Sequence, residues 1–260
     1  MAEMRVHAPH AQGECAPGFR TPKVRCRLCC LQEFCEPEGL ERGEIDFLKT
    51  FVKKQELRLR RGEHPYRQGD EFRALIALHT GSLKVTVAAP DGTERVTRFA
   101  ITGDMVGMEG IESGRHGDDA VALEESGACL LPWDRVEEAA ARIPLVRRQL
   151  MRMLSREIRR GEAVGLLLGR LSAKERFAAF LLDLSDRFAS RGLDGLRFRL
   201  SMSRPDIGSF LGLTPETVSR LFTEFRDESL LGVNAKQVKL LQPELLRALA
   251  RQASPTAFRN

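Results

Sequence analysis

The stretch "RPDIGSFLGLTPETVSRLFTEF", residues 204–225, decides the fold of this 260-residue chain. It predicts two short helices joined by a turn at Gly212. The second helix has a start signal, because Thr214 is an N-cap residue and Pro215 takes the first helical position, where its missing N–H costs nothing. Apolar residues share one face of the first helix: Ile207, Phe210 and Leu211. The pattern is typical of a helix-turn-helix, and the alternative is an ordinary helical hairpin.

The second helix of this pair has a polar face at its start. We expect Val218, Leu221 and Phe222 to face inward, which leaves the polar side chains of the first turns pointing outward. That is where a recognition helix meets base edges in the major groove of DNA. The candidate DNA-binding residues are Thr214, Glu216, Thr217, Ser219 and Arg220. The strand-like residues 230–241, "LLGVNAKQVKLL", would form a wing beside the helix.

Residues 57–132 have a different pattern of apolar and polar residues. Short runs alternate apolar and polar residues, and turn signals such as Gly69-Asp70, Gly81 and Gly103-Asp104 punctuate them. Regularly spaced short strands with such turns indicate a β-sandwich or roll. The "PDGT" at 90–93 predicts a hairpin, because Asp-Gly tolerates the positive φ of a tight turn.

A helix is expected from residue 132 to 169, between the β-rich and the C-terminal regions. Small or apolar residues recur along it at alternating steps of three and four, which is the seam of two helices wound together. The seam residues are Met151, Leu154, Ile158, Gly161, Gly165 and Leu168. Because the rest of the surface is rich in arginine, we expect a homodimer interface; the alternative is a helix packed on its own β-domain.

Composition limits the class of protein. The chain is 42% hydrophobic and 30% charged with a net charge of +5, typical of a globular protein that could attract phosphate backbones. No apolar run is long enough to span a bilayer, and the first residues lack the apolar core of a secretory signal. We therefore expect a bacterial cytoplasmic protein. The sequence offers neither a Gly-rich nucleotide loop nor a paired catalytic constellation, so we do not expect an enzyme.

The stretch "RCRLCCLQEFC", residues 25–35, contains four of the six cysteines. In a reducing cytoplasm, metal or redox chemistry explains clustered thiols better than disulfides do. Cys26, Cys29 and Cys35 have the spacing C-x2-C-x5-C, and Cys129 lies far away in sequence. Four thiolates could hold an iron–sulfur cluster or a zinc ion.

The order of β-roll, long helix and winged helix-turn-helix resembles the cyclic-AMP-receptor superfamily of bacterial regulators. Its nucleotide-binding members use an arginine and a neighbouring hydroxyl to hold the cyclic phosphate. At the matching place in "GMEGIESGRHGDDAVAL" stand Asp118 and Asp119, and two carboxylates repel a phosphate. We therefore expect no cyclic nucleotide, although a register slip could bring Arg115 into the arginine's place.

Within that superfamily the chain resembles the FNR family of oxygen sensors, from about Cys26 to the carboxyl end. The resemblance is carried by the cysteine spacing and by three motifs: "GLTPETVSR", "RQLMRMLSREI" and "GACLLPW". It implies a [4Fe–4S] cluster on Cys26, Cys29, Cys35 and Cys129, which favours a DNA-bound homodimer without oxygen. It also implies TTGAT-like half-sites, with Arg220 on the guanine, and contact between RNA polymerase and β-roll loops near Asp91-Gly92.

Other readings stay open at this point. A zinc ion on the same cysteines would have a structural role. A regulator of the same fold could also bind haem or a small effector in place of the cluster. The cysteines alone would suit an iron–sulfur enzyme or electron carrier as well. Cys15 and Cys30 fall outside the family spacing. Gly161 stands where familiar members carry an acidic residue that keeps the clusterless form monomeric.

The fold class expected is α+β. We divide the chain into a flexible cysteine segment (1–36), a cyclic-nucleotide-binding-like β-roll (37–140), a dimerisation helix (141–169), a winged helix-turn-helix domain (170–250) and a tail (251–260).

Overall fold

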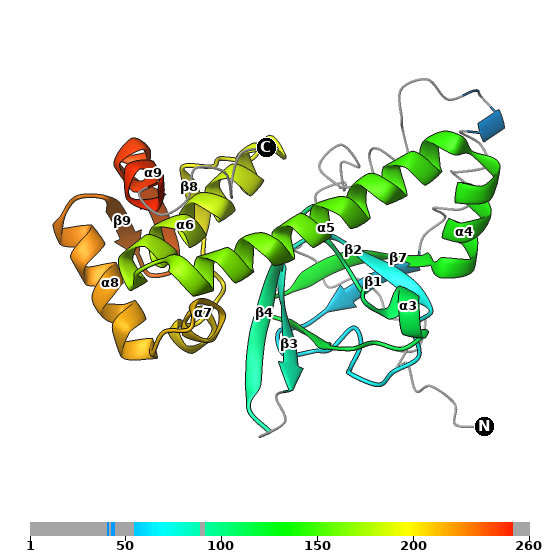
Figure 1. Cartoon of the computed structure of the whole chain (residues 1–260), viewed down its shortest axis with the longest axis horizontal. Coiled ribbons are helices and arrows are strands. Elements are labelled where there is room, and N and C mark those ends of the chain that lie inside the picture. Colours follow the sequence, from blue (N-terminus) through cyan, green and yellow to red (C-terminus); the bar gives the residue numbers. More distant parts are fainter. Residues whose placement is uncertain (1–40, 42, 45–54, 89–91, 252–260) are drawn as a thin grey trace, which may run out of the picture.

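A computed structural model describes residues 41, 43–44, 55–88 and 92–251 of the chain. The expected α+β architecture is confirmed: a β-roll is followed by a long helix and then by a helical head that carries a small sheet (Figure 1). Cys15, Cys26, Cys29, Cys30 and Cys35 lie outside the described residues. No helix among the described ranges is long and apolar enough to cross a membrane.

Two antiparallel sheets form the β-roll. The four-stranded sheet has the order β1 (Gln55–Leu59), β7 (Ser126–Pro132), β2 (Ala74–Thr80), β5 (Met105–Val106). The three-stranded sheet has the order β4 (Glu94–Ile101), β3 (Ser82–Ala88), β6 (Asp119–Ala122), and a short helix α3 (Gly110–Ser113) precedes β6. Strands β3 and β4 pair as the hairpin predicted from "PDGT". Gly92 has φ +80°, as a tight turn requires, while Asp91 lies outside the described residues.

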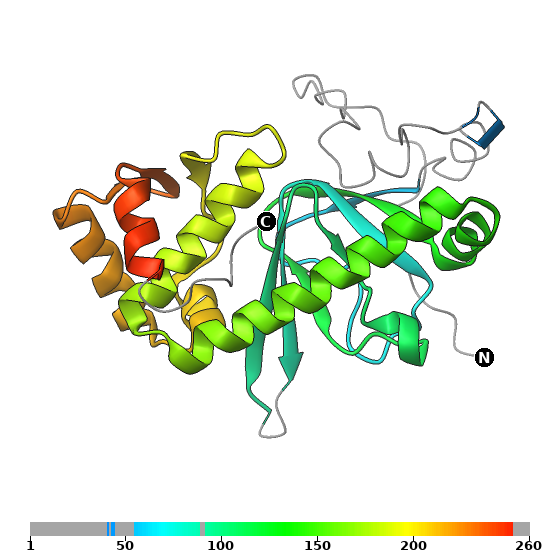
Figure 2. The same cartoon turned by 45° about the horizontal axis from the view of Figure 1, so that its top comes forward.

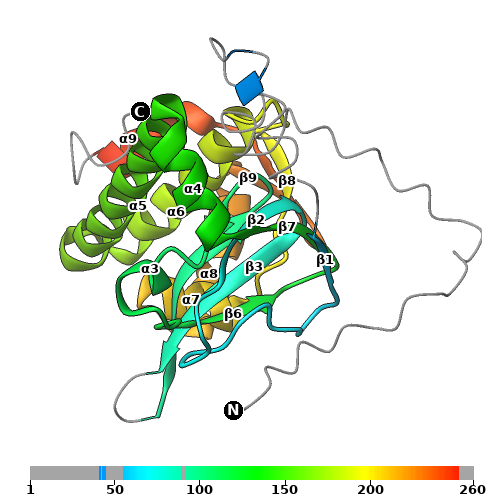
Figure 3. The same ribbon diagram turned by 90° about the vertical axis from the view of Figure 1, so that its right-hand side faces the viewer.

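The helix predicted from residue 132 is two helices, which corrects the sequence analysis. Helix α4 (Trp133–Arg142) ends before Ile143, whose φ of −118° and ψ of 104° are extended, and α5 (Pro144–Arg170) follows. The cause is Pro144, since a proline disfavours helical backbone in the residue before it and is well suited to the first position of a new helix. Figure 3 shows α4 and α5 on one side of the β-roll strands.

The buried face of α5 packs on its own β-roll. Its residues Val146, Leu150 and Met153 join a core with α4 and with the outer face of the four-stranded sheet. A second core, which includes Leu78 and Ala128, fills the space between the two sheets. Apolar packing therefore anchors the long helix over its first three turns, and its later turns cross β4 and reach the head (Figure 2).

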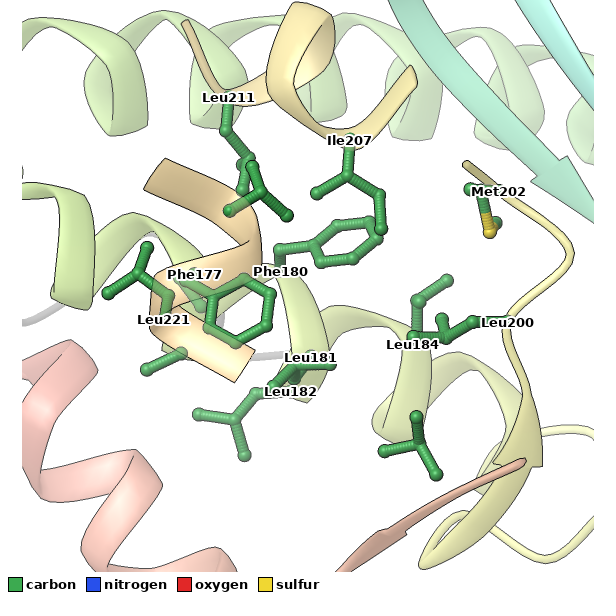
Figure 4. Packing of buried hydrophobic residues seen from close by; sticks show 14 of the residues in the cluster. Phe177, Phe180, Leu181, Leu182, Leu184, Leu200, Met202, Ile207, Leu211 and Leu221 are labelled. Atoms are coloured by element: carbon green, nitrogen blue, oxygen red, sulfur yellow. The ribbon is translucent and has the colours of Figure 1, made fainter. Parts of the chain in front are cut away.

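The head comprises residues 173–251. Its elements are α6 (Ala173–Ala189), β8 (Arg197–Arg199), α7 (Arg204–Leu211), α8 (Pro215–Asp227), β9 (Leu231–Asn234), β10 (Gln237–Leu240) and α9 (Pro243–Arg251). The strands have the order β8-β10-β9, so the predicted wing is confirmed as the β9–β10 hairpin. Figure 4 shows Phe177 and Phe180 of α6 within a cluster that includes Ile207, Leu211 and Leu221.

The head also packs against the β-roll. Phe99 of β4 contacts both Phe180 and Phe210, with ring centroids 6.0 and 5.3 Å apart, and belongs to the same buried cluster as the head core. The Lys84 ammonium pairs with the Asp206 carboxylate at 2.8 Å, and the Val96 N–H donates to the Ser209 hydroxyl at 2.9 Å. The first helix of the pair is thus the side of the head that faces the roll.

Candidate nucleic-acid interface and cysteine site

The helix-turn-helix forms with the start and stop signals read from the sequence. Ser203 and Asp206 make a capping box at the start of α7, and Gly212 ends that helix with φ +64° and ψ +41°. The Thr214 hydroxyl accepts the Thr217 N–H at 3.2 Å and so caps α8, as predicted. Val218, Leu221 and Phe222 are buried, which confirms the inward face.

Sequence reasoning missed a second glycine that the turn needs. A Cβ on Gly208 would lie 2.6 Å from the Leu213 carbonyl oxygen, closer than any side chain tolerates. The signal was present, because Gly208 stands four residues before Gly212 inside a helical pattern, where glycine costs about 1 kcal/mol unless packing requires it.

The candidate DNA-binding residues lie together on one open face. Glu216, Ser219 and Arg220 are exposed on the first two turns of α8, and this helix lies at the end of the molecule away from the β-roll (Figure 1). Thr214 is exposed and Thr217 is half-buried, and their hydroxyl oxygens are 3.1 Å apart at the start of the helix. The Ser219 hydroxyl donates to the Pro215 carbonyl at 2.9 Å.

The charge of Glu216 is favoured where it stands. Hydrogen bonds to its own backbone N–H and to the Thr214 side chain lower the pKa of this carboxyl, so it is ionised at neutral pH. An ionised carboxylate at a helix N-terminus is also stabilised by the helix dipole. Glu216 is therefore a pure hydrogen-bond acceptor beside the Arg220 donor.

The wing adds positive charge beside α8. Lys236 and Lys239 of the β9–β10 hairpin are exposed. Such side chains suit a phosphate backbone.

Helix α5 has an unburied apolar stripe opposite its buried face. Met151, Ile158 and Leu166 are 54%, 65% and 46% exposed, values that are high for large apolar side chains. Of the other predicted seam residues, Leu154 is half-buried, while Gly161 and Gly165 are exposed with open space around them. Leu168 is half-buried against the head core of its own chain, and Leu166 was not singled out from the sequence.

Cys129 lies on β7, in the middle of the four-stranded sheet. Its Cα is opposite Glu56 of β1 on one side and Ala77 of β2 on the other. The residue is half-buried and packs in part against the core beneath α4 and α5. Among the described residues, no group of three histidines, cysteines or carboxylates is placed to hold a metal. A site that includes Cys129 therefore needs ligands from elsewhere in the chain.

Known proteins resemble the chain over nearly its full length. It is 42% identical to the transcriptional activator protein Anr of Pseudomonas protegens, over 88% of this chain and 93% of that protein. It is 36% identical to the fumarate nitrate reduction regulatory protein of Klebsiella oxytoca, over 98% and 99% of the two chains. The chain belongs to the FNR family. It is a DNA-binding transcription regulator of the FNR type.

Two domain families and a solved structure agree with FNR-family membership. Residues 56–142 match the cyclic nucleotide-binding domain, and residues 175–249 match the Crp-like helix-turn-helix domain. The structure of FixK2 from Bradyrhizobium japonicum is similar with a TM-score of 0.68 and 33% identity, covering 75% of this chain and 96% of that one.

The cyclic-nucleotide region of this FNR-family chain brings the carboxyl groups of Glu109 and Asp118 close together. The His116 ring stacks on Tyr66 with centroids 3.8 Å apart and is 2.8 Å from a Glu109 carboxylate oxygen. Burial, followed by the nearby Glu109 carboxylate, raises the pKa of Asp118 to about 7. The Asp119 carboxylate accepts the Gln68 N–H at 2.6 Å.

Arg115 lies at the surface of the same region. Its guanidinium donates to the Gly69 carbonyl at 2.8 Å, and the residue is exposed. The register slip considered from the sequence stays a hypothesis.

Proposed function

We propose that this FNR-family chain is an oxygen-responsive transcription activator. It binds a palindromic TTGAT-like site as a homodimer when it holds a [4Fe–4S] cluster, and it controls genes of anaerobic metabolism. The names of its relatives, a transcriptional activator and fumarate and nitrate reduction regulators, support this class. The observation that carries the proposal is the half-buried Cys129, opposite the first strand that follows the cysteine segment.

The donor set fits an iron–sulfur cluster. Cys26, Cys29, Cys35 and Cys129 would be its ligands, and four thiolates are the usual set for a [4Fe–4S] cube. The strand register supports this, because Glu56, at the start of β1, lies opposite Cys129. Residues 36–54 separate Cys35 from β1, and a chain of that length can reach about 60 Å when extended, so length is no obstacle. When bound, such a cluster supplies the sensitivity to oxygen.

The polar face of α8 would read the DNA. Arg220 would donate two hydrogen bonds to a guanine in the TTGAT half-site, and the ionised Glu216 would accept from a base amino group on the opposing strand. Ser219 would contact a thymine or a phosphate. Thr214 and Thr217 lie in the first turn of α8, where helix N–H groups favour phosphate oxygens.

The apolar stripe on α5 would hold the second copy. Met151, Leu154, Ile158, Gly161, Gly165 and Leu168 would form the twofold seam, and the exposure of Met151 and Ile158 in one chain supports this. A twofold axis along this helix presents two recognition helices to two half-sites of a palindrome. We also propose that RNA polymerase contacts the β3–β4 hairpin near Gly92 and that the protein works in the cytoplasm. No cyclic nucleotide would bind, because the carboxylates of Asp118 and Asp119 would repel its phosphate.

The test is a comparison of full-length protein purified without oxygen and after exposure to air. We expect a broad brown visible absorption that bleaches in air, and fluorescence anisotropy should show tight binding to a TTGAT palindrome only before exposure. A Cys129→Ser variant should lose the colour and the tight binding together. A sharp Soret band would instead support haem, and a colourless protein with bound zinc would support a structural metal; either result overturns the cluster.

A further inference from the structure

A buried carboxylate lies where the β-roll, the long helix and the head meet. Asp104 stands in the turn between β4 and β5, and its side chain is only 1% exposed. It contacts the guanidinium groups of Arg187, near the end of α6, and of Arg191, just beyond that helix. Arg160 of α5 approaches the same carboxylate at 3.5 Å.

The ion pairs continue around Asp104 and join all three parts of the molecule. Arg98 of β4 pairs with Glu157 of α5 at 2.6 Å, and Glu157 also pairs with Arg160 at 2.7 Å. Arg187 pairs with Asp183 at 3.0 Å and donates to the Phe99 carbonyl of β4 at 2.9 Å. The head is thereby tied both to the roll and to the long helix.

The backbone holds Asp104 rigidly at this junction. The Gly103 N–H donates to the Leu78 carbonyl at 2.7 Å, and the Leu78 N–H donates to the Asp104 carbonyl at 2.8 Å. Gly103 has φ +89°, and a Cβ there would lie 2.5 Å from the Arg191 side chain. The glycine therefore lets Arg191 lie flat against the turn.

The charges at this junction depend on one another. Burial alone would raise the pKa of Asp104, but Arg187, Arg191 and Arg160 outweigh it and hold that pKa well below its usual range. Burial lowers the pKa of Arg191, and Asp104 opposes that change. A buried charge that loses its partner is strongly unfavourable. These ion pairs therefore favour one orientation of the head relative to the roll and α5, and other orientations cost free energy.

That arrangement leaves the recognition face open. The head is docked through α7, where Asp206 and Ser209 contact the roll, while Glu216 and Arg220 of α8 stay exposed. The docked head is therefore compatible with DNA binding.

We propose that Asp104, through Arg187, Arg191 and Arg160, is the positioning residue that sets the angle between the head and α5, and thereby the half-site spacing that the dimer accepts. The proposal rests on the proposed twofold dimer. In such a dimer each recognition helix is placed by its own head, and half-sites about one helical turn apart are selected by geometry. One added base pair shifts and rotates a half-site, so only a rigid head rejects the altered spacing.

The test compares two DNAs for each protein, a palindrome of native spacing and one with a single base pair inserted at its centre. Full-length protein prepared without oxygen should prefer the native spacing strongly. We expect Arg191→Gln to reduce that preference about tenfold while its affinity for a single half-site is unchanged. Arg191→Lys, which keeps the charge, should retain most of the preference. The matched control is Arg135→Gln, an arginine of α4 whose ion pair with Glu138 is at the surface.

Two further variants guard against a loss of folding. Asp104→Asn removes the shared partner and is checked by its thermal midpoint, while Arg160→Gln removes only the longest contact and should reduce the preference to a smaller degree. If Asp104→Asn folds, it can be combined with Arg191→Gln. The double variant should lose no more of the spacing preference than the more affected of the two single variants, because both changes break the same ion pair. Unaltered spacing preference in Arg191→Gln and Arg160→Gln, with intact half-site affinity, overturns the inference. If the wild-type protein does not bind the palindrome at all, the proposed function fails instead.

Discussion

The Leu213 N–H donates to the Gly208 carbonyl, with nitrogen and oxygen 2.9 Å apart, across the turn of the helix-turn-helix. The two residues are so close that a Cβ on Gly208 would meet the Leu213 carbonyl oxygen. We expect Gly208→Ala to destabilise the protein by about 2 kcal/mol, the order of an overpacked site. Chemical denaturation followed by circular dichroism measures this. Gly169→Ala is the control, because open space surrounds Gly169 on α5, which is not among the proposed seam residues, and alanine should not destabilise that helix.

Arg220 lies in the second turn of α8, and Arg226 lies in the last turn of the same helix. Both are exposed, and Arg226 pairs with Asp227 at 3.3 Å. We expect Arg220→Ala to weaken operator binding by about 1–3 kcal/mol and to relax the preference for guanine in the half-site, because a two-pronged base contact is lost. Arg226→Ala should change affinity little. Anisotropy titrations with base-substituted operators measure both effects, and equal losses in the two variants would argue against Arg220 as the residue that reads the guanine.

Ile158 is the most exposed large apolar residue of α5. In the proposed seam, Ile158→Glu places two unpaired carboxylates at the twofold axis, and we expect the dimer to weaken about 100-fold or more. Analytical ultracentrifugation without oxygen measures the change. Leu245→Glu is the matched control, since Leu245 is 51% exposed on α9, outside the seam. A dimer that tolerates Ile158→Glu places the interface elsewhere.

Gly161 offers a direct test of the acidic residue that the family resemblance implies at this place. No atom lies within 4 Å of a Cβ built on Gly161, so a side chain fits in the single chain. We expect Gly161→Asp to weaken dimerisation of air-exposed protein about tenfold through repulsion of like charges across the axis. Gly161→Asn has the same size without the charge and should weaken it less. Identical behaviour of the two variants would exclude the electrostatic explanation.

Asp118 predicts an unusual pH dependence of stability. Because its pKa is raised to about 7 in the folded protein from 3.8, the folded state binds more protons than the unfolded state between these values. Stability is therefore lost as the pH rises from about 4 to about 7. We expect Asp118→Asn to stabilise the protein at pH 7.5 by roughly 1 kcal/mol, a value reduced for solvent screening, and to have little effect at pH 4. Denaturation curves at both pH values test this.

A second variant checks the cause of that dependence. Glu109 is the neighbouring carboxylate that helps to raise the pKa of Asp118, after burial. Glu109→Gln should therefore move the pH dependence toward lower pH without abolishing it. An unchanged profile in Glu109→Gln would show that Glu109 does not help to raise the pKa of Asp118.

Local signals account for what the sequence predicts well. Gly212, Thr214 and Pro215 specify a turn and a helix start within four residues, and the alternation in β3 and β4 lies within single strands. The break at Ile143 was also readable, since Pro144 follows it, but the continuous apolar periodicity outweighed that signal.

Long-range relations account for what the sequence did not predict. Asp104 is a surface-type residue after a turn glycine, and nothing near it indicates burial. Its partners Arg187 and Arg191 lie 83 and 87 positions away in the chain. The closeness of Gly208 to Leu213 likewise follows from the angle between two helices, which no residue pattern specifies. The raised pKa of Asp118 depends on burial beside Glu109, which only the folded chain produces.

The packing of Phe99 against Phe180 and Phe210 has a consequence for chimeric regulators. Since one apolar cluster includes β4 and the head, exchanging heads between relatives would expose or mismatch the surface around Phe99 unless the β4 side were exchanged with it. The same continuity should make the roll and the head melt in a single calorimetric transition, so that they behave as one cooperative folding unit.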